Sequence, residues 1–134
     1  AMNPAFWEKL DQLIADHEIC IDRPRGSAHP RYPELIYGVD YGYLAGTSAA
    51  DGEGIDLFLG TSGEKRLTGL VVCVDMEKAE TEIKLLIGVT ESEFNWIMNM
   101  VNETDSMKGL LINREGERDH HQRHAPSAPG ENSL

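Results

Sequence analysis

The chain has few cysteines, few basic residues and no long apolar segment. Its 134 residues include two cysteines, Cys20 and Cys73, which lie in apolar runs and form no CxxC pair. This usage favours buried, reduced thiols of a cytoplasmic protein over a disulfide. No apolar run approaches the roughly 20 residues of a membrane span, and the first residues lack the basic and apolar segments of a signal peptide. We therefore expect a cytoplasmic protein with no membrane partner.

Positive charge is scarce. Twelve Lys and Arg residues against 23 Asp and Glu residues give a formal net charge of −11. A surface of this sign repels nucleic-acid phosphates, so we expect no nucleic-acid partner. Phosphate-containing small molecules are not excluded, because bound cations can reverse the local sign of the potential.

The length fits one domain. Apolar spacing predicts a helix over 4–17, with Phe6, Trp7, Leu10 and Ile14 on its buried face, and a capping box at Thr90–Glu93 begins a second helix over 91–103. The Gly-rich segment at 51–56 predicts a loop that leads directly into an apolar strand. Branched and apolar runs predict five strands, at 18–22, Ile55–Leu59, Leu67–Asp75, 82–89 and Met107–Asn113.

The composition changes after residue 114. Residues 1–114 have the pattern of a folded domain, whereas 115–134 are polar, with Pro and Gly and almost nothing to bury. This is typical of a disordered tail. Its His120, His121 and His124 could bind a transition metal, but a flexible tail is the simpler interpretation.

The most informative segment carries Asp51, Glu53 and Asp56 within a stretch of six residues. Carboxylates this close repel one another unless a positive group lies between them, and their oxygens are natural ligands of magnesium and calcium. An EF-hand loop does not fit, because Ile55 and Ser62 occupy positions that need oxygen ligands. The segment therefore predicts a metal-dependent reaction on an anionic substrate, with a plain solvated turn as the alternative.

A second acidic cluster lies at 74–84. In the strand predicted there, Glu82 and Lys84 are two residues apart, so their side chains share a face. Alone, this would be a solvated hairpin. Combined with the first cluster, it could complete a cage for two or more metal ions, with Lys84 facing a phosphate.

Three motifs with matching order and spacing resemble those of soluble family I inorganic pyrophosphatases, over about residues 19–90. The family's Asp-Gly-Asp-Pro-Leu-Asp signature follows a Tyr-Gly pair and a Thr, as Asp51–Asp56 here follow Tyr41-Gly42 and Thr47. A later family motif of Asp, Asp and Lys is matched by Glu77, Glu82 and Lys84. An upstream Glu and a Lys-Tyr pair nine residues on are matched by Asp22 and Arg31-Tyr32.

The resemblance implies a mainly β fold, a five-stranded, twisted barrel of the OB type with an N-terminal and a C-terminal helix packed outside. It implies magnesium-dependent hydrolysis of inorganic pyrophosphate or a related phosphoanhydride, with manganese or cobalt as alternative ions, and leaves a homo-oligomer open. The implied metal ligands are Asp51, Asp56, Glu77 and Glu82. Glu53 would accept a proton from the attacking water, and Tyr41, Arg31 and Lys84 would bind phosphate oxygens.

The sequence also departs from the family pattern. Glu53, Glu77 and Glu82 stand where the family has Asp, and a phosphate-binding arginine and a late Tyr-Lys pair have no counterpart. Arg23, Arg25, Arg66 and Arg114 are candidates to replace the arginine, and no pattern selects among them. The alternative function is a pyrophosphatase-like module that binds metal and phosphate with weak or no catalytic activity.

Overall fold

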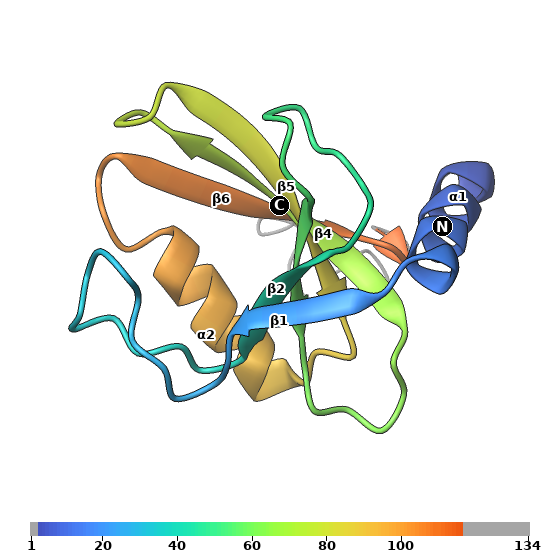
Figure 1. Ribbon diagram of the computed structural model, residues 1–134, viewed down its shortest axis with the longest axis horizontal. Coiled ribbons are helices and arrows are strands. Elements are labelled where there is room, and N and C mark those ends of the chain that lie inside the picture. The colour runs from blue at the N-terminus through green and yellow to red at the C-terminus, as the bar shows by residue number, and fades with distance from the viewer. Residues whose placement is uncertain (1–2, 117–134) are drawn as a thin grey trace, which may run out of the picture.

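The computed structural model describes residues 3–116, which form six strands and two helices (Figure 1). In chain order they are α1 (Pro4–Asp16), β1 (Ile19–Arg23), β2 (Asp40–Leu44), β3 (Ile55–Leu59), β4 (Leu67–Asp75), β5 (Glu80–Ile87), α2 (Glu91–Val101) and β6 (Met107–Asn113). The predicted tail, with its three histidines, lies outside the described residues apart from 115 and 116. No helix within 3–116 is long and apolar enough to cross a membrane.

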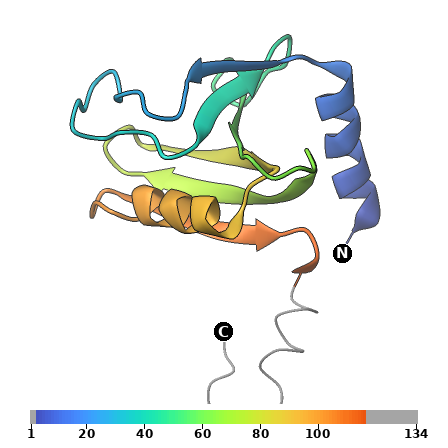
Figure 2. The same ribbon diagram turned by 90° about the horizontal axis from the view of Figure 1, so that it is seen from below.

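The strands form one sheet in the order β1-β2-β3-β5-β4-β6. Neighbours are antiparallel except β3 and β5, which are parallel. The sheet is strongly curled, with β1 and β2 on one side, β4 and β6 with α2 on the other, and α1 along one end (Figure 2). The expected count of five strands is wrong, and β1 and β6 are unpaired edges within the described residues, so this part of the chain forms no closed barrel.

The additional strand is β2, in a segment where the sequence analysis predicts no strand. It pairs with β1 and with β3. Gly42 makes this possible, because a Cβ at this position would overlap the backbone carbonyl oxygen of Cys20 on β1. A glycine that looks like a loop residue is therefore required for close strand pairing.

Side chains alternate between two cores on opposite faces of the sheet. We call them the α1 face and the α2 face after the helix that packs against each core. Buried on the α1 face are Trp7, Leu44, Leu57, Leu67, Leu70, Leu85 and Ile87. Buried on the α2 face are Tyr37, Val39, Tyr41, Phe58, Val71, Cys73, Leu86, Ile97 and Val101.

Helix α1 buries one of its two aromatic residues. Trp7 is 4% exposed, as expected, but the prediction that Phe6 is buried beside it is wrong, since Phe6 is 42% exposed. Phe6 instead packs edge-on against Trp7, with 5.4 Å between ring centroids. Adjacent helical residues point about 100° apart, so only one of the two can face the sheet.

Helix α2 begins with the predicted capping box, in which Thr90 Oγ1 accepts from the Glu93 N–H and Glu93 Oε1 accepts from the Thr90 N–H. Glu93 also accepts from the backbone N–H and hydroxyl of Thr61. Both cysteines are free thiols, as predicted. Cys73 is buried as expected, whereas the expected burial of Cys20 is wrong, since Cys20 is half-buried.

Candidate functional site

A nearly buried lysine lies at the centre of the candidate site. Lys84 on β5 is 7% exposed, and its Nζ donates to the Tyr41 hydroxyl at 2.7 Å. The same Nζ lies 3.4 Å from Glu82 Oε2 and 3.6 Å from Asp56 Oδ2. We call Tyr41, Asp56, Glu82 and Lys84 the Lys84 cluster.

Strand register brings the cluster together. Asp56 is the direct partner of Lys84 in the parallel β3–β5 pair, and Glu82 precedes Lys84 by two residues on the same face. Tyr41 on β2 is the partner of Phe58, two residues after Asp56 on β3. The cluster therefore lies on the α2 face, where Phe58 and Leu86, each two residues further along its strand, are buried.

The protonation states follow from burial and charge. Burial has the largest effect on Asp56 and raises its pKa; the Lys84 charge opposes this and the nearby Glu82 carboxyl adds to it. Burial also works against the Lys84 ammonium, but Tyr41, Glu82 and Asp56 outweigh it and raise the pKa of Lys84. Burial raises the pKa of Tyr41 too. The cluster thus holds an ammonium and a neutral phenol beside two carboxyl groups.

The remaining predicted acidic residues lie in connections. Asp51 and Glu53 are exposed in the β2–β3 loop, where the Glu53 N–H donates to Asp51 Oδ1 at 2.9 Å. Glu77 is exposed in the β4–β5 turn, and its N–H donates to Asp75 Oδ1 at 3.0 Å. Within residues 3–116, no group of three or more His, Cys, Asp or Glu side chains is arranged to hold a metal ion.

The predicted basic residue Arg31 is exposed in the connection between β1 and β2, where its backbone N–H donates to His29 Nδ1 at 2.9 Å. No hydrogen bond or ion pair joins it to the Lys84 cluster in the described part of the chain. A different arginine does reach the cluster. The Cζ of Arg23 on β1 lies 5.5 Å from the ring centroid of Tyr41.

Sequence reasoning named Arg23 only as one of four candidates. The signal that singles it out is strand register, since Arg23 is the direct partner of Tyr41 in the β1–β2 pair. That register could not be derived from the sequence, because no strand is predicted at residues 41–44.

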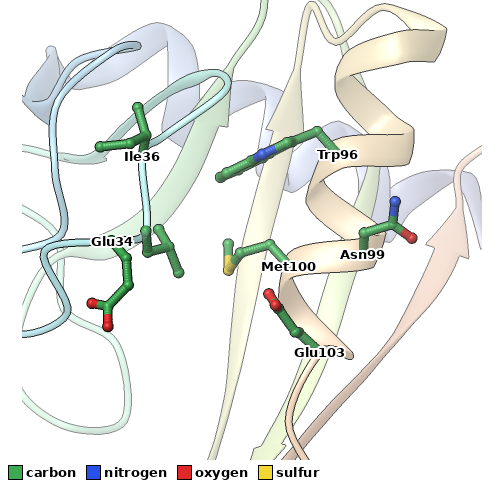
Figure 3. Close-up of a pocket in the computed structure, with 7 residues that line it drawn as sticks. Glu34, Ile36, Trp96, Asn99, Met100 and Glu103 are labelled. Carbon is green, nitrogen blue, oxygen red and sulfur yellow. The ribbon is translucent and has the colours of Figure 1, made fainter.

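Two hollows in the described chain are separate from this cluster. A cavity of about 310 Å³ lies between the β1–β2 connection and α2, with Glu34 and Ile36 on one side and Trp96, Met100 and Glu103 on the other (Figure 3). It contains none of the residues predicted to act on phosphate or metal. A second cavity, of about 260 Å³, lies under the start of α2 and also excludes them.

No protein-family model and no curated protein sequence matches this chain. Among solved structures, an inorganic pyrophosphatase from Neisseria gonorrhoeae is similar, with a TM-score of 0.52 and 16% identity over 78% of this chain and 86% of that one. An inorganic phosphatase from Anaplasma phagocytophilum matches with a TM-score of 0.43 and 13% identity, over 72% of this chain and 80% of that one. The first likeness is one of fold, and it confirms the predicted mainly β architecture of the OB type with two outer helices.

Proposed function

We propose that this chain hydrolyses inorganic pyrophosphate or a related phosphoanhydride with the help of a divalent cation. The observation that carries the proposal is the Lys84 cluster, in which an ammonium, a phenol and two carboxyl groups meet on adjacent strands. This cluster lies in a fold shared with a pyrophosphatase.

The Lys84 cluster contains donor atoms of the kind that bind magnesium. Asp56 and Glu82 have side chains 28% and 23% exposed, and both approach one cation. Carboxylate oxygens in a partly desolvated position are suitable magnesium ligands. Asp56 and Glu82 are two of the four metal ligands expected from the resemblance. The other two, Asp51 and Glu77, are included in the proposal on the basis of the sequence alone. Magnesium bound there would supply activation of the attacking water and neutralise phosphate charge.

The protein's own donors bind the substrate in this proposal. An ammonium has three N–H donors and no hydrogen-bond acceptor. Lys84 can therefore donate to a phosphate oxygen when a metal ion binds the carboxylates of Asp56 and Glu82. The neutral Tyr41 hydroxyl can donate to a neighbouring oxygen. Because both groups are buried or nearly so, these bonds are stronger than they would be in water. Glu53 stays the expected acceptor of the proton of the attacking water.

Phosphate release tests the proposal. Pyrophosphate, nucleoside triphosphates and polyphosphate are each incubated with the protein and magnesium, manganese or cobalt. Asp56→Asn is expected to lower the rate at least about 100-fold, because it removes an anionic ligand beside Lys84. The matched control is Asp105→Asn, at an exposed position before β6. Absence of release from every substrate with every ion would overturn the proposal.

A second function, a binding module without turnover, is favoured by two observations. In residues 3–116 no three-ligand metal group is assembled, and Arg31 does not contact the cluster. Calorimetry that shows binding of magnesium pyrophosphate by a protein that releases no phosphate would select this function over the enzyme.

A further inference from the structure

Arg23 differs from the cations that form ion pairs with carboxylates. Within residues 3–116, Arg66 pairs with Glu115, Arg114 pairs with Asp11, and Lys84 pairs with Asp56 and Glu82. Arg23 is half-buried, and within residues 3–116 no carboxylate lies within 4 Å of its guanidinium; the carboxylate of the adjacent Asp22 acts on it only at longer range. Removing a charge from water without a counter-ion is costly. Because no carboxylate occupies its N–H groups, this guanidinium is free to bind an anionic group from outside the chain.

The guanidinium is also held in position. Its Nη1 donates to the Tyr37 hydroxyl at 2.7 Å, and its Cζ lies 5.8 Å from the Tyr37 ring centroid and 5.5 Å from that of Tyr41. Tyr37 is itself 4% exposed. The flat, fixed rings restrict the long side chain. A guanidinium carries five N–H donors, and the bond to Tyr37 uses one of them.

Arg23 and Lys84 approach the same ring. Lys84 Nζ lies 5.0 Å from the centroid of Tyr41, and Arg23 Cζ lies 5.5 Å from it. The two cations reach Tyr41 from different strands, β1 and β5, on which they are held by independent contacts. Two positive groups around one phenol match the charge of a ligand with two linked anionic groups.

We propose that Arg23 is the second anion-binding cation of the site and makes it selective for a diphosphate. Arg23 binds one phosphoryl group and Lys84 binds the other, with Tyr41 between them. This proposal rests on the proposed function. Tyr37 is a positioning residue that acts through Arg23.

The test is calorimetric titration of the full chain with imidodiphosphate, a diphosphate analogue that is not hydrolysed, in the presence of magnesium. Arg23→Met is expected to weaken binding about 10- to 100-fold, the range for losing a charge-assisted hydrogen-bonding group. The matched control is Arg25→Met, which removes the same charge two residues along at an exposed position. Arg25 contacts Asp40 through its backbone N–H, so the control keeps that bond; we expect a change of less than about twofold.

Two further variants test the geometry and guard against misfolding. Tyr37→Phe removes the acceptor for Nη1 while keeping the ring, and a loss of about threefold is expected. Arg23→Lys keeps the charge but lacks the planar fork, and an intermediate loss is expected. If Arg23→Met fails to fold, these two variants decide the question, and binding equal to the wild type in both would overturn the proposal.

Titration with orthophosphate gives the selectivity. In this proposal orthophosphate binds through Lys84 alone, so Arg23→Met is expected to leave its affinity unchanged. Equal losses for orthophosphate and imidodiphosphate, or equal affinities of Arg23→Met and Arg25→Met, would overturn the role of Arg23 and leave the proposed function standing. A wild-type protein that neither binds imidodiphosphate nor releases phosphate would overturn both.

Discussion

Lys84 sets the charge balance at the residue scale, because it is the cation closest to both Asp56 and Glu82. Lys84→Met keeps most of the side-chain volume but leaves these carboxyl groups facing each other. We expect the free energy of unfolding at pH 7 to fall by about 3 kcal/mol, as for a broken buried ion pair. Urea denaturation measures this change. Lys78→Met, in the exposed β4–β5 turn, is the control, and an equally small loss in both variants would show that Lys84 contributes no such balance.

Glu93 gives a pH dependence at the same scale. Burial works against its charge, but hydrogen bonds from Thr90 and Thr61 outweigh this and lower its pKa below the ordinary 4.5. A carboxyl group with a lowered pKa stabilises the fold above its unfolded pKa, and this stability is lost as the pH falls through the folded value. The wild type is therefore expected to lose more stability below pH 4.5 than Glu93→Gln.

Urea unfolding at pH 6, 4 and 3 measures this difference. Glu91→Gln, an exposed neighbour in the same first turn, serves as the control and should follow the wild type. Parallel stability curves for Glu93→Gln and the wild type would contradict the assigned role of the Glu93 hydrogen bonds.

At the scale of elements, β2 connects the N-terminal edge strand to the rest of the sheet. Gly42→Ala would place a Cβ against the Cys20 carbonyl oxygen, a backbone atom that can move only if β1 moves. We expect a loss of about 3 kcal/mol or more in the free energy of unfolding. Gly63→Ala is the matched control, because nothing lies within 4 Å of a Cβ at that position. Thermal unfolding of both variants measures the difference, and similar midpoints would mean that β1 tolerates the displacement.

The same strand marks where sequence reasoning succeeds and fails. β3, β4 and β6 begin and end at the predicted residues, because runs of Val, Ile and Leu between turn residues carry their own signal. β2 has Gly42 between two tyrosines, and its extended form depends on partners distant in the chain. The contacts among Asp56, Glu82 and Lys84 involve strands that the sequence did predict. The contact between Arg23 and Tyr41 required the register of the strand that it did not.

At the scale of the whole molecule, one contact joins the two ends of the described chain. Arg114, just after β6, donates through both terminal nitrogens to the Asp11 carboxylate of α1, each at 2.8 Å, and its Cζ lies 5.7 Å from the Trp7 ring centroid. The hydrogen bond to Arg114 lowers the pKa of Asp11. The pair therefore fastens α1 to the end of the sheet.

A double-mutant cycle with Asp11→Asn and Arg114→Met measures this link. The Asp11 side chain is 46% exposed, so water screens the pair, and we expect a coupling free energy of about 1 kcal/mol that shrinks with added salt. The control cycle is Arg66→Met with Glu115→Gln, whose side chains are 51% and 40% exposed. A coupling of zero in the Asp11–Arg114 cycle would show that packing alone fastens the helix.

The Lys84 ammonium between Asp56 and Glu82 also determines whether the chain can fold without a metal ion. Where acidic groups rely on a metal ion for neutrality, the polypeptide folds only once it is loaded, and chelators unfold it. Here the counter-ion is covalently part of β5, so a newly synthesised chain can complete its sheet from its own residues. Folding is therefore expected to be independent of a divalent cation, even if the proposed activity requires one, and the unfolding midpoint in a chelator should match that in plain buffer.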